Sequence, residues 1–163
     1  MQTSERYCTR AHTLGAETQL GAEFAQHTAA EVMVTRPKTL PIDTSLEEAR
    51  AIFDDDLHVR MLLLVDDGVL HGTLLRTDLL STRAPTDLAL PLARLTDRTT
   101  NPDERIIAIH ERLVASGRRL AVIDTNHRLL GLLCLKRHQS GFCSDEGIMA
   151  RAREREAAGR PAP

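Results

Sequence analysis

The stretch VRMLLLVD at residues 59–66 has a close counterpart, GRRLAVID, at residues 117–124. In each copy a turn and then a glycine follow, Gly72 in the first and Gly131 in the second. A motif present in two copies, spaced by roughly 60 residues, indicates a pseudo-symmetric pair of small units rather than an open-ended array of repeats. The functional site is therefore expected between the two halves of the chain.

The first copy has the pattern of a buried strand followed by a hairpin. Residues 61–65 are all apolar, which predicts a strand buried on both faces. The turn residues 66–68 (Asp-Asp-Gly) predict a hairpin connection, and residues 69–75 supply the return strand. Gly72 within that strand would permit a bulge or the close approach of another backbone or a ligand.

A helix is expected before each hairpin. In the first copy an edge-like strand at 38–42 precedes Thr44-Ser45-Leu46-Glu47, a capping box that predicts a helix ending at the acidic run 54–56. In the second copy a cap at 101–104 begins a helix that stops at Gly117. The remaining expected elements are strands at 118–124 and 128–135 and a last helix from 144–146.

Composition limits the classes of function. Of the 163 residues, 42% are hydrophobic but only 2% are aromatic, so the core must consist of Leu, Val, Ile and Ala, without an aromatic platform for bases or sugars. The net charge of -2 argues against nonspecific binding to nucleic acid or to an anionic membrane. Three cysteines form an odd, sparse set that favours a reducing cytoplasm. No run of about 18 apolar residues occurs, so a soluble protein is expected.

The first copy also contains a specific set of residues at fixed spacing: Val32-Met33, Pro37, Thr39-Leu40, Asp43-Thr44-Ser45-Leu46, Glu48-Ala49, Val59-Arg60, Val65-Asp66, Gly72 and Thr77-Asp78-Leu79. The second copy keeps Pro102-Asp103, Ile123-Asp124 and Gly131. Together they resemble the tandem cystathionine-beta-synthase (CBS) domain pair, or Bateman module, over about residues 31 to 150. The resemblance implies an α+β fold of two pseudo-symmetric β-α-β-β-α units packed sheet to sheet.

Family members commonly bind adenosine ligands in the two clefts between such units. The resemblance assigns the ribose-binding carboxylate to Asp78, whose two oxygens can each accept a hydroxyl donor. The family's Ser or Thr three residues earlier is Leu75 here, and the second copy has Cys134 and Arg137 at the two equivalent positions. One adenosine-type site is therefore expected, not two. The other residues assigned to it are Thr39, Leu40, Leu62 and Leu63 around the base and Arg60 at the phosphate.

Plainer roles compete for several of these residues. Asp78 could simply cap a short helix starting at Leu79, and Arg60 could belong to a solvated rim or an ion pair. Cys134, His138 and Cys143 lie within ten residues and could bind zinc, but structural zinc sites usually need four ligands in tighter pairs. A buried strand cysteine and two loop residues are the favoured account, so no metal site is expected.

The leading functional hypothesis is a stand-alone regulatory module, in which an adenosine-type ligand (AMP, ADP, ATP or S-adenosylmethionine) changes packing or oligomeric state. The alternative is a purely structural interaction module with ligand-free clefts. No catalytic residues and no cofactor are expected, and the resemblance implies a homodimer, with a regulated protein partner possible. The expected parts are an N-terminal extension (1–28), a first CBS motif (29–82), a connector (83–95), a second motif with the C-terminal helix (96–157) and a tail (158–163).

Overall fold

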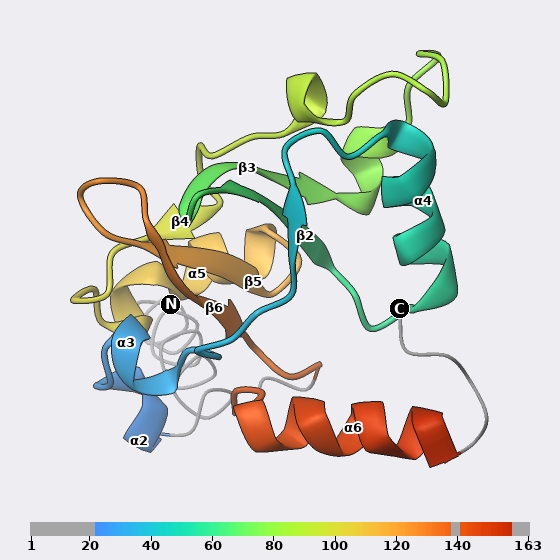
Figure 1. Cartoon of the computed structure of the whole chain (residues 1–163). Helices are drawn as coiled ribbons and strands as arrows, with labels where there is room; N and C mark the ends of the chain where they lie inside the picture. Colours follow the sequence, from blue (N-terminus) through green and yellow to red (C-terminus); the bar gives the residue numbers. More distant parts are fainter. Residues whose placement is uncertain (1–21, 138–140, 158–163) are drawn as a thin grey trace, which may run out of the picture.

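The computed structural model describes residues 22–137 and 141–157, which form two similar units and a C-terminal helix (Figure 1). The first unit consists of β1 (Thr39–Pro41), α4 (Leu46–Asp55), β2 (Met61–Asp66) and β3 (Val69–Leu75). Its sheet has the order β1-β2-β3, in which β1 is parallel to β2 and β2 is antiparallel to β3. The apolar run at 61–65 and the Asp-Asp-Gly turn thus form the predicted strand and hairpin.

The second unit repeats this topology with β4 (Thr99–Thr100), α5 (Ile106–Ala115), β5 (Arg119–Ile123) and β6 (Leu129–Cys134), in the order β4-β5-β6. The strand registers are equivalent: Thr39 pairs with Leu63 as Thr99 pairs with Ala121. Each hairpin also has a register shift at the same place, between Leu64 and Val65 in the first unit and between Val122 and Ile123 in the second. The internal repeat is therefore a structural repeat.

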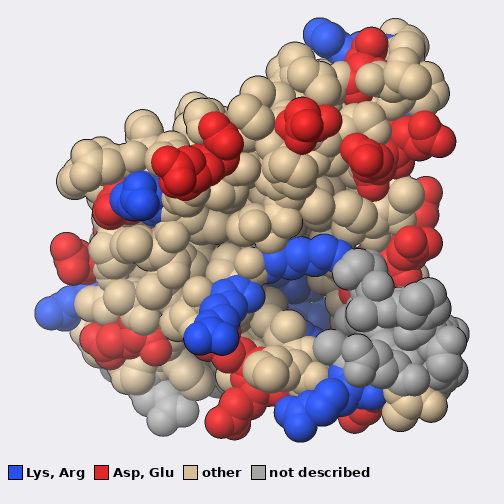
Figure 2. Space-filling model, in the orientation of Figure 1, with Lys and Arg blue, Asp and Glu red and all other residues tan. Residues whose placement is uncertain are grey.

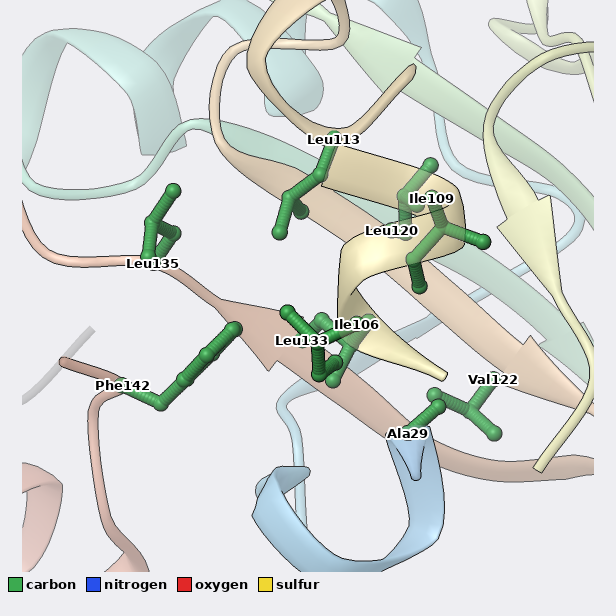
Figure 3. Close-up of a cluster of buried hydrophobic side chains, with 9 residues drawn as sticks. All are labelled: Ala29, Ile106, Ile109, Leu113, Leu120, Val122, Leu133, Leu135 and Phe142. Carbon is green, nitrogen blue, oxygen red and sulfur yellow. The ribbon is translucent and has the colours of Figure 1, made fainter. Parts of the chain in front are cut away.

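The two sheets pack against each other through a shared apolar cluster. Met61, Leu63 and Leu70 from the first sheet contact Ala121 and Ile123 from the second. Because side chains alternate across a strand, the neighbouring residues of β2, Leu62 and Leu64, point the other way and pack under α4. The second unit buries a corresponding cluster beneath α5, which Figure 3 shows with Ile106, Ile109 and Leu113 facing the sheet. This arrangement confirms the predicted sheet-to-sheet packing.

Segments that precede each unit cross over and join the sheet of the other unit. Val34 forms a bridge with Leu132 on β6, and Arg94 forms a bridge with Thr73 on β3. The short helices α2 (Ala22–Ala25) and α3 (Ala29–Val32) precede β1, and Ala29 is fully buried in the cluster of the second unit. The two units are thus tied together by backbone hydrogen bonds as well as by apolar contact.

Helix starts differ from the sequence predictions by one or more residues. The capping box of α4 uses Ser45 and Glu48, not Thr44 and Glu47. The Ser45 hydroxyl accepts a hydrogen bond from the Glu48 amide at 3.2 Å, and the Glu48 carboxylate accepts one from the Ser45 amide at 2.8 Å. Thr44 instead donates its hydroxyl hydrogen bond to the Pro41 carbonyl. In the second unit the helix begins at Ile106, so the cap predicted at 101–104 lies in the preceding turn.

Three further helices complete the described chain. The 3-10 helix η1 (Arg76–Leu79) follows β3, η2 (Leu90–Leu92) lies in the connector, and α6 (Asp145–Ala157) is the predicted last helix. Asp145 anchors α6 by accepting hydrogen bonds from the amide and hydroxyl of Thr35 at 3.0 and 2.9 Å. No helix in the described ranges is both long and apolar enough to cross a membrane. The predicted conformation of residues 1–21 and of the tail 158–163 lies outside the described residues.

Candidate functional site

Asp78 lies in η1, directly after the last strand of the first unit, and its carboxylate is fully engaged. Arg98 donates two hydrogen bonds to it, Nη1 to Oδ2 at 2.5 Å and Nη2 to Oδ1 at 2.9 Å, and the Leu75 amide donates a third at 2.7 Å. The Asp78 and Arg98 side chains are 6% and 10% exposed. This is a bidentate, nearly buried ion pair, the strongest geometry for an arginine and a carboxylate.

Arg98 reaches Asp78 from the other unit. Arg98 directly precedes β4, and its backbone carbonyl accepts a hydrogen bond from the Ala121 amide of β5 at 3.0 Å. Its guanidinium also donates a hydrogen bond to the Thr73 carbonyl of β3 at 3.2 Å. The backbone of Arg98 therefore belongs to the second sheet and its side chain to the first unit. This pair was not predictable from the sequence, because no motif links the two positions.

The surroundings of Asp78 favour its ionised form. Burial alone would raise the pKa of the carboxyl, but the hydrogen bonds from Arg98 and from the Leu75 amide, with the positive charges of Arg98 and Arg94, lower the pKa below its ordinary value. Asp78 is thus ionised at neutral pH, with its carboxylate already bonded to Arg98 and to the Leu75 amide.

A second feature is a group of arginines where the strands β2 and β5 begin. Arg60 precedes β2, and Arg118 and Arg119 lie at the start of β5. Burial, together with the nearby charges of Arg118, Arg60 and Arg151, lowers the pKa of Arg119 to about 10. Burial and the charges of Arg60 and Arg137 likewise lower the pKa of Arg118. We call these five residues, Arg60, Arg118, Arg119, Arg137 and Arg151, the arginine cluster.

The arginine cluster has little compensating negative charge. Among the described side chains, no carboxylate forms an ion pair with any of the five. The Arg119 guanidinium donates to the Arg118 and Leu135 carbonyls at 3.0 and 3.3 Å, and Arg118 Nε is buried without an acceptor. Figure 2 shows Lys and Arg side chains gathered around a hollow above α6. Such an arrangement attracts anions.

The structure separates the six residues assigned to the adenosine site. Asp78 faces Arg98, whereas Arg60 is exposed and belongs to the arginine cluster. Leu62 and Leu63 point to opposite faces of β2, and both are buried, in the cluster under α4 and in the cluster between the sheets. Their side chains therefore cannot line one wall of a cleft.

Thr39 and Leu40 lie on β1, at the edge of the first sheet. Leu40 lines a pocket of about 570 Å³ on the outside of the first unit, together with Pro41, Asp43, Thr44, Glu48, Ala51 and Ile52. This pocket contains none of the other predicted site residues. Its two carboxylates, Asp43 and Glu48, make it a poor match for a phosphate. Asp78 and the arginine cluster are therefore the two candidate positions for ligand contact.

The pseudo-symmetry shows how the two units differ at the position of Asp78. Met61 pairs with Leu75 in the first unit, and Arg119 pairs with Cys134 in the second. Arg137 follows Cys134 by three residues, as Asp78 follows Leu75, so Arg137 is the counterpart of Asp78. Exposed Lys38 precedes β1 as buried Arg98 precedes β4, so these two residues are also counterparts. The ion pair of Asp78 with Arg98 is thus replaced by two cations at the equivalent positions of the repeat. The strand registers agree with the sequence prediction that the second copy lacks the carboxylate.

Cys134 differs from its predicted state. Its sulfur is bonded to that of Cys143, which joins the end of β6 to the segment before α6. This bond corrects the expectation of an unpaired strand cysteine. It was not predictable, because a spacing of nine residues between two of three cysteines has no specific meaning. Among the described residues no group of His, Cys, Asp and Glu could hold a metal ion, and His138 lies outside them.

Comparison with known proteins agrees with this architecture. Residues 29–84 match the family model described as "CBS domain", and no curated protein matches the chain. A structure of CBSX2 in complex with AMP superposes with a TM-score of 0.56 at 19% identity, covering 79% of this chain and 98% of that one. The CBS domain pair of protein MJ0100 in complex with 5-methylthioadenosine and S-adenosyl-L-methionine gives 0.51 at 18% identity, covering 78% and 97%.

A third similar structure is the cytosolic domain of the Mg²⁺ channel MgtE in complex with ATP, with a TM-score of 0.52 and 19% identity. The match covers 72% of this chain but only 49% of the MgtE chain, so the present chain spans about half of that protein's domain. These similarities show that the chain shares its fold with the three proteins. The present chain therefore has the fold of a tandem CBS-domain pair, and its first unit matches the CBS domain model.

Proposed function

We propose that this CBS pair is a regulatory module that binds a phosphorylated adenosine ligand between its two units. The observation that carries the proposal is the convergence of the arginine cluster at the starts of β2 and β5 without a partner carboxylate among the described side chains. Arginine is well suited to phosphate because its guanidinium forms two parallel, charge-assisted hydrogen bonds. A phosphate would also relieve the mutual repulsion of the arginines.

The remaining parts of the ligand are assigned by the expected family pattern. Asp78 would accept the two ribose hydroxyls, Arg60 would contact the phosphate, and the backbone at Thr39 and Leu40 would flank the base. Leu62 and Leu63 contribute only by fixing the position of β2, since both side chains are packed in the cores. The arginine cluster favours AMP, ADP or ATP over S-adenosylmethionine, which has no phosphate.

Regulation would follow from the position of the site between two units. A ligand shifts an equilibrium only by its difference in affinity for the two states. A phosphate held between Arg60 of the first unit and Arg118 of the second would favour their close approach, which their like charges oppose. A partner protein or a second copy of the chain would respond to this change. We propose a regulatory rather than a catalytic role.

Isothermal titration with AMP, ADP, ATP and S-adenosylmethionine tests this function. We expect binding of the phosphorylated ligands, with an affinity that falls as ionic strength rises. Arg60→Ala should weaken ATP binding by about tenfold or more, because one charge-assisted contact is lost. Arg153→Ala is the matched control, since it removes an exposed arginine from α6 outside the cluster. Absence of binding by all four ligands would exclude the proposed function.

A specific observation favours a second candidate function, a structural dimerisation module with ligand-free clefts. Asp78 is already paired with Arg98, and Leu75 offers no hydroxyl to a ligand. Ile107 and Val114 lie seven residues apart on α5, on one face, and are 41% and 39% exposed. Light scattering distinguishes the candidates: a dimer whose mass and stability do not respond to nucleotides supports the structural function, and a response supports the regulatory one.

A further inference from the structure

We propose that Arg98 competes with the ligand for Asp78, so that a ribose must displace the Arg98 guanidinium from this carboxylate. The displacement breaks hydrogen bonds that connect the two CBS units. The inference rests on the proposed function, because it concerns the same adenosine site. Its basis is the bidentate pair of Asp78 with Arg98, which uses both carboxylate oxygens.

The competition follows from the number of acceptors. The two oxygens of a carboxylate offer about four acceptor positions. At Asp78 three of them are used, by Arg98 at 2.5 and 2.9 Å and by the Leu75 amide at 2.7 Å, so too few remain for both hydroxyls of a ribose diol. Neutral hydroxyl donors are weaker partners than a guanidinium. A ribose alone would therefore not displace Arg98.

A phosphorylated ligand can make the exchange favourable. An arginine released from a nearly buried carboxylate needs a new anionic partner, because an unpaired buried charge is costly. The ligand phosphate is such a partner, and the ribose hydroxyls replace Arg98 at Asp78. The same ligand thus supplies both the donors for the carboxylate and the acceptor for the displaced guanidinium.

The exchange has a consequence for the packing of the units. The carbonyl of Arg98 is bonded to Ala121 in the second sheet, while its guanidinium is bonded to Asp78 and to the Thr73 carbonyl in the first unit. Displacement of the guanidinium removes three hydrogen bonds across the interface between units. Ligand binding in this cleft therefore loosens one connection between the units, which the second cleft lacks because Lys38 and Arg137 are both cations.

The test compares AMP with 2′,3′-dideoxy-AMP, which differs only in the two ribose hydroxyls. In the wild-type protein we expect AMP to bind only slightly more tightly than the dideoxy ligand, because its hydroxyls gain Asp78 at the cost of the hydrogen bonds from Arg98. In Arg98→Met the Asp78 carboxylate has no arginine partner and is free to accept the ribose hydroxyls. The ratio of the affinity for AMP to the affinity for the dideoxy ligand should therefore rise about tenfold or more over its wild-type value. In Asp78→Asn/Arg98→Met the preference for AMP should disappear.

The outcomes separate the two proposals. If Arg98→Met prefers AMP over the dideoxy ligand no more than the wild type does, Arg98 is not a competitor and this inference is wrong, while the proposed function stands. If no variant and no wild-type protein binds either ligand, the proposed function itself fails. Arg98→Gln, which keeps a polar side chain beside Asp78, provides the same comparison if Arg98→Met does not fold, as judged by circular dichroism.

Discussion

Gly131 lies directly against the backbone of Val34, so that a Cβ atom at position 131 would be 2.6 Å from the Val34 carbonyl oxygen. The same carbonyl accepts a hydrogen bond from the Leu132 amide at 3.0 Å, which is part of the bridge that joins the N-terminal segment to β6. Gly72 occupies the equivalent place in the first unit, against Ala93 beside the bridge from Arg94 to Thr73. The repeated glycine therefore permits the crossing of the two segments.

Gly131→Ala and Gly72→Ala should each destabilise the fold by about 1–3 kcal/mol or more, because the added methyl meets backbone or packed atoms that cannot move without breaking the bridge. Chemical denaturation measures the loss. Gly141→Ala is the control, since its Cβ would meet only Phe24 at ordinary contact distances of 3.5 and 3.6 Å. Equal stability of all three variants would contradict the role assigned to the crossing.

The repeat and the buried runs made most of the fold predictable. The apolar run 61–65 specified a strand with two buried faces, and Gly72 indicated a close approach, because both signals are local. The crossing at Val34 and Leu132 was not predictable, since a single bridge has no periodicity. The same is true of Asp78 and Arg98, which are 20 residues apart and meet only once the sheets dock. The family pattern supplied the position of Asp78 but not its partner.

The Asp78–Arg98 pair should show strong coupling in a double-mutant cycle. Arg98→Met leaves a nearly buried carboxylate without its partner and should cost about 3–5 kcal/mol of unfolding free energy. Asp78→Leu/Arg98→Met removes both charges and should recover most of that loss. Urea denaturation of the wild type, both single variants and the double variant gives the coupling energy. Additive effects of the two substitutions would show that the residues do not interact.

Acid should weaken the fold partly through Asp78. The pKa of this carboxyl is lower in the folded protein than its ordinary value of 3.8, so its stabilising effect is complete above pH 3.8 and is lost as the pH falls through the folded-state value. Asp78→Asn should therefore lose less stability than the wild type on acidification below about pH 4. Glu104 also has a lowered pKa, so part of the acid sensitivity remains. Identical slopes for the two proteins would contradict a folded-state shift at Asp78.

The bond between Cys134 and Cys143 should stabilise the chain and hold the start of α6. Cys143→Ser should lower the unfolding free energy by about 2–3 kcal/mol, since the bond closes a short loop in the unfolded state. The double variant Cys134→Ser/Cys143→Ser should have about the same unfolding free energy as either single variant, because each single substitution already removes the whole bond. Any further difference would come from the packing of the second serine. Dithiothreitol should destabilise the wild type but not the variants, and an unaffected wild type would argue against the bond.

Arg118 should show a conflict between stability and ligand binding. Its φ of 65° lies in the left-handed region, which costs a non-glycine residue about 1–2 kcal/mol, and its positive charge lies near Arg60 and Arg137. Arg118→Gly should therefore raise stability by about 1 kcal/mol while weakening ATP binding. Asp67→Gly is the matched control, because Asp67 also has a positive φ, 49°, but belongs to the hairpin turn. This control should gain stability without losing ATP affinity. If Arg118→Gly keeps full affinity for ATP, the guanidinium of Arg118 does not contact the phosphate, and the strain at this position has another origin.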